Sequence, residues 1–261
     1  MPKPLHEISV LISTYNDRNL VDKKLREIEA QTAFLRAEFI FVDSASPGNE
    51  RELLEPFCER YKNCRLITLE ERISLYHAWN IGWEAASAPL VCISNMDDVM
   101  HPNLLRRVVE EMEASRWDLA SVLITKQRLG SRWVDLERLR TRELTLSTRP
   151  GPFFAWRREL KDKIAMFDDR MTIAGDKDFW ARAADASLRI GLIPEILYIY
   201  SKHSGQLSKN KEHLTRIASD MKIADGKAYP NQWPSAIQKS IRRYRLFQNC
   251  FGWGRFDPSA H

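Results

Sequence analysis

Two adjacent carboxylates, Asp97 and Asp98, stand at the end of an apolar run of the sequence that begins at Leu90. The run is short enough to be a buried strand, and Pro102 marks the start of a predicted helix. Mg²⁺ and Mn²⁺ prefer hard oxygen ligands and keep coordination positions for phosphate oxygens, so aspartates at a strand end suit either metal. An Asx turn that caps the next helix would use the same residues, and the motif alone does not decide between these roles.

The segments before this motif alternate between predicted strands and amphipathic helices. Apolar strands are predicted at 8–13, 38–42 and 65–69, ahead of the strand that begins at Leu90. Each is followed by apolar residues at helical spacing, with Pro47 at the predicted start of the second helix. This alternation predicts an α/β fold with a mostly parallel, Rossmann-like central sheet and helices on both faces.

Polar residues follow three of these strands. Thr14 and Tyr15 come after the first strand, Asp43 after the second, and Asp97 and Asp98 after the fourth. Ligands of such sheets bind outside the carboxyl ends of the strands, so the fold would gather these residues at one edge. There Asp43 can accept a hydrogen bond from a pyrimidine N–H, and the Tyr15 ring can stack on a base. With a metal at the paired aspartates to hold a pyrophosphate, the set predicts a nucleoside-diphosphate site.

The second half of the chain has a weaker pattern. A fifth strand is predicted at 120–125, and two short strands at 189–193 and 196–200 on either side of Pro194. The arginine-rich stretch 127–149 is interpreted either as a solvated excursion or as an acceptor-facing loop whose arginines meet a phosphate.

Two residues of this half are candidates for chemistry. Asp176 lies at the predicted start of a helix that opens at Gly175. Capping explains a carboxylate there, and the same carboxylate could accept a hydroxyl proton as a general base. His203 lies in a polar loop, where a surface role and a contact with a phosphate or a metal are both open.

The composition narrows the class of protein. The chain has 261 residues, of which 44% are hydrophobic and 29% charged, so it can form a globular core. Its net charge of +5 favours anionic ligands, but no helix-turn-helix, zinc-finger or RNA-binding pattern points to nucleic acid. Without a secretory pattern or a membrane-length apolar run, we expect a cytoplasmic protein. The cysteines have no zinc-type spacing and are predicted to be free thiols: Cys58, Cys64, Cys92 and Cys250.

Four motifs together resemble the family 2 glycosyltransferases, which have the GT-A fold. They follow one another in the family's order and cover about residues 6 to 210: Ile12-Ser13-Thr14-Tyr15-Asn16, Val42-Asp43-Ser44-Ala45-Ser46, Asn95-Met96-Asp97-Asp98 and Gly175-Asp176-Lys177-Asp178-Phe179-Trp180. The helix before the acidic motif, from Ser74 to Gly82, is also similar to that of the family.

The resemblance implies an inverting transfer of a sugar from a nucleoside-diphosphate sugar, with Mn²⁺ or Mg²⁺ as cofactor. It implies that Ser13, Thr14 and Tyr15 line the nucleotide pocket and that Asp43 binds the base. Asp97 would serve both ribose and metal, and Asp98 the metal. Asp176 would be the catalytic base, and His203 and Asn95 would contact the diphosphate or the metal.

The chain departs from the family pattern at four positions. The family often has aspartate at Asn95, glycine at Ser74, arginine at Trp79 and glutamate at Gly175. Asn95 keeps an oxygen ligand but loses a charge, which leaves open which carboxylate grips the metal. Gly175 removes a carboxylate beside the proposed base, so the acceptor geometry is expected to differ from that of other members.

The acceptor implied by the resemblance is a glycan or a lipid-linked molecule, in cell-surface polysaccharide or lipopolysaccharide assembly. Two alternatives are a sugar-phosphate nucleotidyltransferase and an inert nucleotide-sugar-binding or scaffold module. The turn after the first strand lacks the glycine-rich phosphate loop usual for nucleotidyltransferases. The retained carboxylates argue against an inert module.

We expect a GT-A domain at 1–210, with a nucleotide-sugar-binding half at 1–126 and a mixed acceptor half at 127–210. Residues 211–261 are expected to form a helical extension that is basic and aromatic. Such a tail suits peripheral contact with an anionic membrane at its inner face, or docking against the protein's own body.

Overall fold

The computed structural model describes residues 4–132, 152–204, 206 and 220. Its strands are β1 (Ile8–Thr14), β2 (Ala37–Asp43), β3 (Cys64–Thr68), β4 (Leu90–Ile93), β5 (Val99–Met100), β6 (Leu119–Arg128), β7 (Ala155–Arg157) and β8 (Ile190–Lys202). Its helices are α1 (Arg18–Glu29), α2 (Arg51–Arg60), α3 (Leu75–Ala85), α4 (Leu104–Ala114), α6 (Lys161–Ile164) and α7 (Gly175–Asp185), with 3₁₀ turns at Phe34–Arg36 and Arg158–Leu160.

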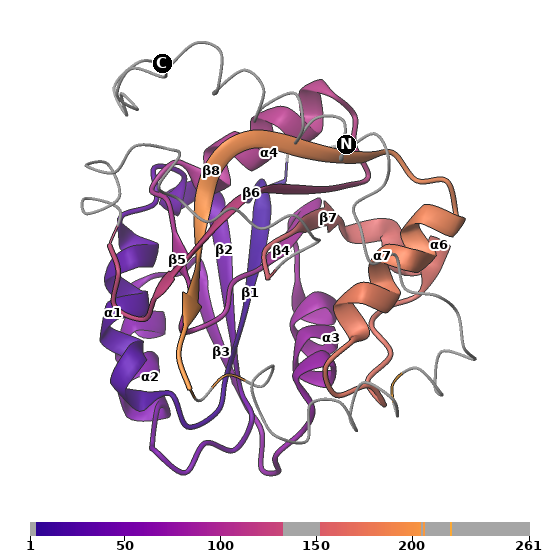
Figure 1. The fold of residues 1–261 in the computed structure, drawn as a ribbon. Coiled ribbons are helices and arrows are strands. Elements are labelled where there is room, and N and C mark those ends of the chain that lie inside the picture. Colours follow the sequence, from indigo (N-terminus) through magenta and orange to yellow (C-terminus); the bar gives the residue numbers. More distant parts are fainter. Residues whose placement is uncertain (1–3, 133–151, 205, 207–219, 221–261) are drawn as a thin grey trace.

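One sheet joins all of these strands, in the order β3-β2-β1-β4-β7-β6-β8-β5. The neighbours β3, β2, β1 and β4 are parallel, which confirms the predicted doubly wound half. Beyond β4 the sheet is mixed, because β7 runs antiparallel to both β4 and β6. In Figure 1 the sheet runs down the middle, with α1 and α2 on the left and α3, α6 and α7 on the right.

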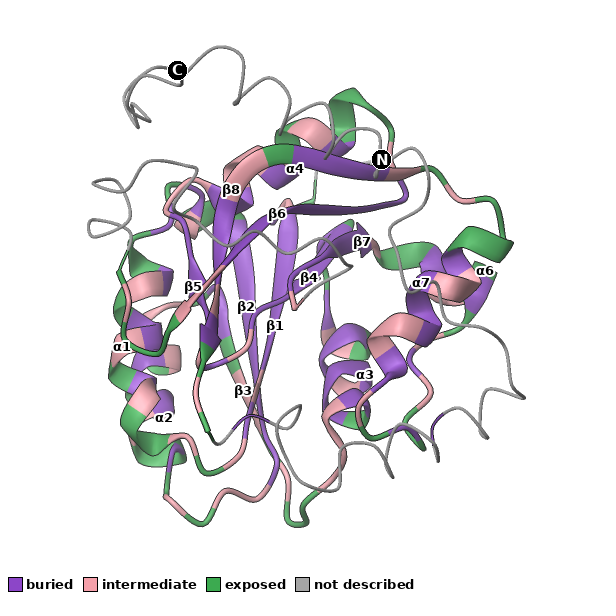
Figure 2. Ribbon diagram, in the orientation of Figure 1, coloured by how far each residue is buried: buried purple, intermediate pink, exposed green. Residues whose placement is uncertain are grey.

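The alternation of side chains along β1 divides the core into two layers. Ile8, Val10 and Ile12 pack with the apolar faces of α1, α2 and α4. Leu11 points to the other face, where it packs with α3 and α7. Figure 2 shows the central strands β1, β2 and β4 buried along almost their whole length and the helices buried on their inward faces. A sheet covered on both faces is what the continuous apolar strands predict.

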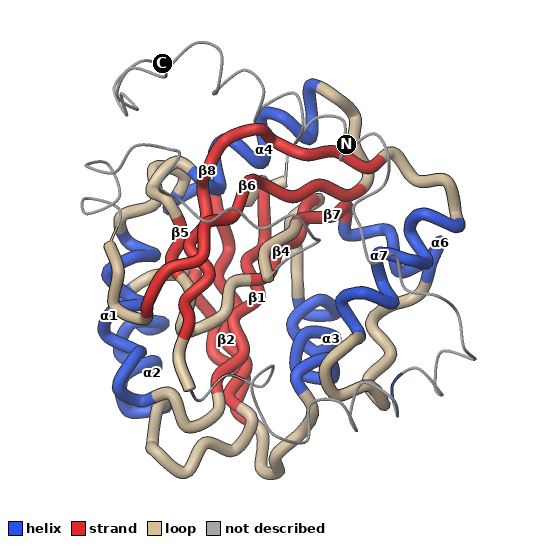
Figure 3. Tube along the Cα trace, in the orientation of Figure 1, coloured by secondary structure: helices blue, strands red, loops and turns tan. Residues whose placement is uncertain are grey.

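Three sequence predictions differ from the structure. The helix predicted to start at Pro102 begins at Leu104, after the short strand β5. The second helix begins at Arg51 and not at Pro47, because Asn49 has a left-handed φ of 55° that interrupts the helical path. The two short strands around Pro194 are a single strand, β8, whose pairing with β6 shifts register near Val122 and Leu123. Pro194 has no N–H for the ladder, and a bulge accommodates it without ending the strand. Figure 3 traces β8 as one continuous strand.

Several other predictions concern this level of structure. Cys58, Cys64 and Cys92 are free thiols, as predicted, while Cys250 lies outside the described residues. Most of the arginine-rich stretch and nearly all of the predicted extension 211–261 also lie outside them. Within the described part of the chain, no helix has the length and apolarity needed to cross a membrane.

Candidate active site

The strand directions bring four chain segments to one edge of the sheet. Two antiparallel pairings lead from β4 through β7 to β6, and β8 is parallel to β6, so β8 ends at the same edge as β4. Asp97 follows β4 and His203 follows β8, and the two side chains meet there. His203 Nε2 lies 2.7 Å from Asp97 Oδ2. The carboxyl ends of β1 and β2 belong to this edge too, since both strands run parallel to β4.

The residues predicted to bind the nucleotide lie at the ends of β1 and β2. Thr14 and Asp43 are partners in the β1–β2 register, and both are buried. Asp43 Oδ1 accepts the backbone N–H of Ser46 at 3.2 Å, which fixes the carboxylate through a turn of its own chain. The Thr14 hydroxyl is buried and has no hydrogen-bond partner among the described residues. Ser13 lies one step before it, opposite Val42. An unpaired buried hydroxyl beside a carboxylate is a place for a ligand's polar atoms.

An arginine that the sequence did not single out lies over Tyr15. The guanidinium carbon of Arg72 is 4.0 Å from the centre of the Tyr15 ring. Arg72 belongs to the loop between β3 and α3, which is tied to the β2 turn because the Ile73 N–H donates to Ser44 Oγ at 2.7 Å. The Tyr15 ring, predicted to stack on a base, therefore carries a cation on one face.

The two adjacent aspartates have different environments. Asp98 is 1% exposed, and its carboxylate accepts hydrogen bonds from the Ser201 N–H at 2.8 Å, the Asn95 amide at 2.9 Å and the Tyr198 hydroxyl at 3.1 Å. Burial and the negative charge of Asp97 raise the pKa of Asp98 to about 8. Asp97 instead has a side chain 23% exposed, with His203 beside it. Of the two carboxylates, Asp97 is the one open to a ligand, and Asp98 joins the acidic turn to β8.

The departure at Asn95 has a structural reason. Its amide donates to Asp98, and its backbone N–H donates to the Tyr198 hydroxyl at 3.3 Å. A carboxylate at this position could not donate to Asp98, and would add a further acidic group to the turn. No contact of the Asn95 side-chain oxygen with Asp97 or His203 is seen among the described residues, so a role for Asn95 toward a metal stays a prediction.

A buried lysine of α1 donates hydrogen bonds to both ends of the acidic turn. Lys24 of α1 is 1% exposed, and its Nζ donates to the Asp98 carbonyl at 2.8 Å, to Glu27 at 2.9 Å and to Ser94 Oγ at 3.3 Å. The Glu27 carboxylate in turn accepts the Met100 N–H at 2.9 Å. A buried lysine is tolerated because each of its contacts is a charge or an acceptor, and it fixes both ends of the turn.

At this edge of the sheet, Asp97 and His203 could coordinate a divalent cation together with oxygen atoms of a bound ligand. Asp97 offers a carboxylate oxygen and His203 a ring nitrogen, both of which Mn²⁺ accepts. Asp17, in the turn after β1, lies near this pair: burial and the charges of Asp97 and Glu50 raise its pKa to about 6, while His203 opposes the shift. In the part of the chain that the structure describes, no three His, Cys, Asp or Glu residues gather closely enough to hold a metal by themselves. A cation here would complete its shell with water and phosphate oxygens, as Mg²⁺ and Mn²⁺ usually do.

The predicted base lies on a different element. Asp176 is the second residue of α7, partly exposed, and the Tyr76 hydroxyl of α3 donates to its Oδ1 at 3.4 Å. Burial raises the pKa of Asp176 to about 6, while Lys177 and Tyr76 oppose the shift. A carboxylate with this pKa is ionised at neutral pH and is a better proton acceptor than an ordinary aspartate.

Gly175 and Trp79, the two positions near the base that differ from the family pattern, both pack against the Tyr76 ring. A Cβ added to Gly175 would lie 2.8 Å from the ring carbons of Tyr76, so no larger residue fits there without moving the ring. The Tyr76 ring also packs edge to face against Trp79, at 5.3 Å between ring centres, and stacks on Phe167 at 6.0 Å. Where the family often has a glutamate and an arginine, this chain therefore packs an aromatic pair against a glycine.

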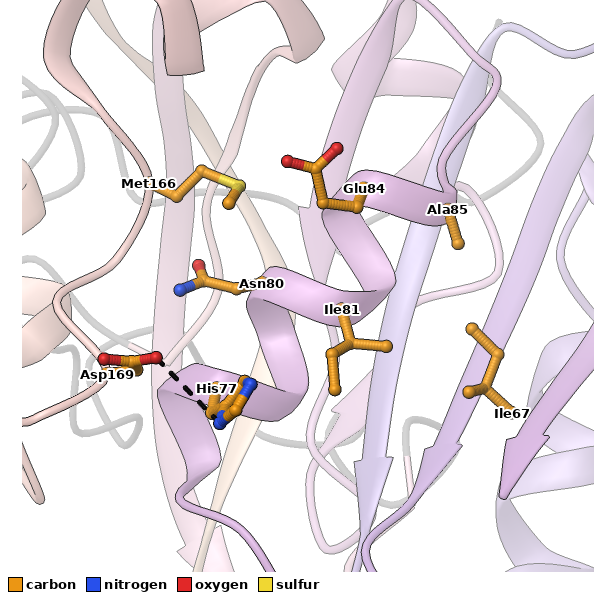
Figure 4. A pocket seen from close by; sticks show the side chains of 8 residues that line it. All are labelled: Ile67, His77, Asn80, Ile81, Glu84, Ala85, Met166 and Asp169. Carbon is orange, nitrogen blue, oxygen red and sulfur yellow. Dashed lines mark ion pairs between the residues drawn. The ribbon is translucent and has the colours of Figure 1, made fainter. Parts of the chain in front are cut away.

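A shallow groove of about 540 Å³ runs along α3, between that helix and the loop before α7. Figure 4 shows His77 and Asp169 facing each other at its end, with 3.9 Å between His77 Nδ1 and Asp169 Oδ2. None of its lining residues is among the predicted site residues.

The sequence missed Asp17, Arg72, Lys24 and Tyr76. Asp17 had a usable signal, because it follows β1 by three residues at the edge where ligands bind. The others had none: Lys24 appears as a helix residue among charged neighbours, and Arg72 and Tyr76 gain their roles from contacts across the fold.

Comparison with known proteins agrees with this geometry. A sequence model of the family described as Glycosyl transferase family 2 matches residues 9–175. The chain is 24% identical over 221 residues to the succinoglycan biosynthesis protein ExoO of Rhizobium meliloti, a match that covers 78% of this chain and 63% of ExoO. Two further glycosyltransferase relatives are matched over 63% and 72% of their own lengths, so the chain spans less than two thirds of some relatives.

Two solved structures share the fold. Residues 1–349 of S. aureus TarS, in complex with UDP-GlcNAc, superpose with a TM-score of 0.66 at 18% identity, over 94% of this chain and 73% of that one. The mannosyltransferase PcManGT of Pyrobaculum calidifontis, in complex with GDP-Man and Mn²⁺, gives a TM-score of 0.61 at 18% identity, over 96% of this chain and 72% of that one. The fold is thus the predicted GT-A type.

Proposed function

Because the chain belongs to glycosyl transferase family 2, we propose that it transfers a sugar from a nucleoside-diphosphate sugar to an acceptor hydroxyl, with inversion at the anomeric carbon. The observation that carries this proposal is the contact of 2.7 Å between Asp97 and His203, at the sheet edge where β1 and β2 also end. The relatives bind UDP-GlcNAc and GDP-Man with this fold, which supports a nucleotide-sugar donor.

The donor nucleotide binds at the ends of β1 and β2. Asp43 accepts a hydrogen bond from the base, and the unpaired Thr14 hydroxyl takes a further polar contact. Tyr15 stacks on the base and Arg72 stacks on Tyr15, so the guanidinium also brings a positive charge toward the phosphates. Ser13 lines this pocket with its backbone and hydroxyl.

Asp97 and His203 would hold a divalent metal, Mn²⁺ or Mg²⁺. Such a metal would supply positive charge to offset the negative charge that develops on the leaving diphosphate. Asp97, whose side chain is 23% exposed, is the metal ligand of the acidic pair, and buried Asp98 holds the turn in place. The low exposure and filled hydrogen bonds of Asp98 favour this division of roles over direct ligation by both residues.

Asp176 is the general base. The ionised carboxylate takes the proton of the acceptor hydroxyl as its oxygen attacks the anomeric carbon from the side opposite the diphosphate, and this single displacement inverts the configuration. A pKa of about 6 keeps the base ionised at neutral pH. Tyr76 donates to the carboxylate and orients it.

The acceptor is a glycan or a lipid-linked molecule, and the pathway is the assembly of a cell-surface polysaccharide or lipopolysaccharide. The support is the similarity to ExoO, a succinoglycan biosynthesis protein. A cytoplasmic location and a membrane contact through residues 211–261 stay predictions.

The two alternatives lose support at this stage. Family membership argues against a sugar-phosphate nucleotidyltransferase. An inert binding module is disfavoured because Asp43, Asp97 and Asp176 all keep positions that chemistry needs. The functional assay distinguishes all three, since a nucleotidyltransferase releases pyrophosphate from a nucleoside triphosphate and sugar phosphate, and an inert module releases nothing.

The test is the release of nucleoside diphosphate from a panel of UDP- and GDP-sugars by the purified chain with Mn²⁺. Enzymes of this kind transfer the sugar slowly to water when no acceptor is present, so at least one donor is expected to turn over, and EDTA is expected to stop the reaction. The matched variants are Asp176→Asn, expected to be inactive, and Asp185→Asn at the exposed far end of the same helix, expected to be unchanged. Turnover that survives in Asp176→Asn would sink the assignment of the base.

A further inference from the structure

One residue of the predicted C-terminal extension is buried against the helix that carries the base. Asp220 is 0% exposed, and its carboxylate accepts three successive backbone N–H groups just before α7. Asp220 Oδ1 accepts the Thr172 N–H at 3.0 Å, and Oδ2 accepts those of Ile173 and Ala174, each at 2.8 Å. The Thr172 hydroxyl adds a fourth contact at 3.3 Å.

We propose that Asp220 is a positioning residue for catalysis: it fixes the chain leading into α7 and thereby the location of Asp176. The inference rests on the proposed function of Asp176 as the base. Asp220 itself touches the backbone and not the reacting atoms.

The start of α7 needs an acceptor from elsewhere in the chain. The residue before the helix is Ala174, which has no side-chain oxygen, and the helix has no capping hydrogen bond of its own. The exposed N–H groups at a helix start and the helix dipole both favour a carboxylate. Asp220 places a carboxylate directly before this helix start, on the N–H groups of Thr172, Ile173 and Ala174, from 46 residues further along the chain.

The residue that Asp220 holds lies close enough in the chain to Asp176 to fix its backbone. Only Gly175 separates Ala174, held by Asp220, from Asp176. On its other side Gly175 lies against the Tyr76 ring, where an added Cβ would come within 2.8 Å. The backbone of the base is therefore held between the Asp220 carboxylate and the Tyr76 ring.

The position of Asp220 in the chain makes this contact informative. The family match ends at residue 175, and the sequence assigned residue 220 to a separate extension that begins at 211. A carboxylate with three backbone donors makes this residue an integral part of the catalytic half, whatever the role of the rest of the extension.

The experiment compares Asp220→Asn with Asp118→Asn in the full chain. Asp118 is also a buried aspartate that accepts a backbone N–H, from Arg189 at 2.9 Å. This contact links the amino-terminal ends of β6 and β8, at the edge of the sheet opposite the candidate site. Turnover of the best nucleotide sugar and the Kd of its nucleoside diphosphate are measured for both variants with Mn²⁺. For Asp220→Asn we expect kcat to fall by about 100-fold, because displacing a catalytic group by an ångström costs that much. Its donor Kd should stay within about threefold of the wild type, since Asp220 holds the chain before α7 and the predicted donor residues lie at the ends of β1 and β2.

A general loss of stability would not give that pattern, because it would affect Asp118→Asn equally. A kcat of Asp220→Asn within a factor of about two of the wild type overturns the inference, and so does an equal fall in both variants. If Asp176→Asn keeps its activity, the proposed function has failed, whereas an inactive Asp176→Asn beside a fully active Asp220→Asn rejects the Asp220 role alone.

Hydrogen exchange on the wild type covers the case in which Asp220→Asn does not fold. The amides of Thr172, Ile173 and Ala174 precede a helix and would exchange quickly without an acceptor. We expect them to be protected to the same degree as the amides inside α7. Rapid exchange at all three positions overturns the inference without any variant.

Discussion

The donor edge and the base-bearing helix position their carboxylates in different ways. At the donor edge, Asp43 and Asp97 come within four residues of a strand end, and a turn of the same chain fixes Asp43 through Ser46. On α7, the base depends on partners far away in sequence, since Tyr76 lies 100 residues before Asp176. The donor edge is thus built from strand ends with one long-range contact, between Asp97 and His203, whereas the catalytic half is built from packing between separate elements. A change in one region should leave the other working.

The largest expected effect is that of Asp176→Asn. The variant should lose about 1,000-fold in kcat, because a general base contributes between 10² and 10⁴. In the wild type, kcat should rise as the pH passes through about 6, where the base becomes ionised. Nucleoside-diphosphate affinity should not change, and a parallel loss of affinity would show that the two regions are not separable.

The same variant has a predicted effect on stability. Burial raises the pKa of Asp176 above its unfolded value, so the folded state binds the proton more tightly and loses stability as the pH rises from about 4 to about 6. Asn pays no such cost. Asp176→Asn should therefore have a higher Tm than the wild type at pH 7.5 and nearly the same Tm at pH 4. Thermal unfolding at both pH values measures this, and a gain that is equal at the two pH values would contradict it.

A smaller effect is expected for Tyr76→Phe. The hydroxyl favours the ionised form of Asp176, so its removal should lower kcat by about tenfold, the cost of one hydrogen bond to a charged group. The acid limb of the pH–kcat profile should also move to higher pH. Tyr61→Phe is the matched control, because the Tyr61 hydroxyl donates to the Glu29 carboxylate on the surface, away from the sheet edge. A pH profile unchanged in Tyr76→Phe would remove the long-range support assigned to the base.

The sequence predicts the residues of the donor edge better than the contacts that give them different roles. Asp43 and Asp97 could be predicted from the sequence because a parallel sheet exposes its strand ends at one edge, whatever the details of packing. The different roles of Asp97 and Asp98 could not, because only the contacts of Asp98 with Tyr198 and Ser201 of β8 show which carboxylate is buried. Pro194 misled the strand assignment for the related reason that the bulge depends on the β6 partner.

Around the base, the sequence predicted the residue but not its support. Asp176 at a helix start fits capping as well as catalysis, and nothing local distinguishes them. The structure shows that Asp220 holds the chain just before this helix, which no local pattern indicates. The glycine at position 175 was seen as the loss of a carboxylate, whereas it makes room for the Tyr76 ring.

The smallest expected effect lies at the donor edge. Arg72→Ala should weaken nucleotide binding by about two- to fivefold, since an exposed cation–π contact contributes about 0.5–1 kcal/mol. Turnover at saturating donor should stay the same. Arg60→Ala removes a similar contact with Tyr61 outside the site and should change neither quantity. Isothermal titration with UDP or GDP decides this, and a fall in kcat without a change in affinity would place Arg72 in the catalytic half instead.

The most direct test of the separation between the two regions is the Mn²⁺ dependence of nucleoside-diphosphate binding in Asp97→Asn and Asp176→Asn. Isothermal titration of each variant and of the wild type, with Mn²⁺ and with EDTA, gives the part of the affinity that the metal contributes. We predict that Asp97→Asn loses that part, so that EDTA no longer changes its Kd, while Asp176→Asn keeps it in full. Equal Mn²⁺ dependence in Asp97→Asn and the wild type, or its loss in Asp176→Asn, would contradict the account.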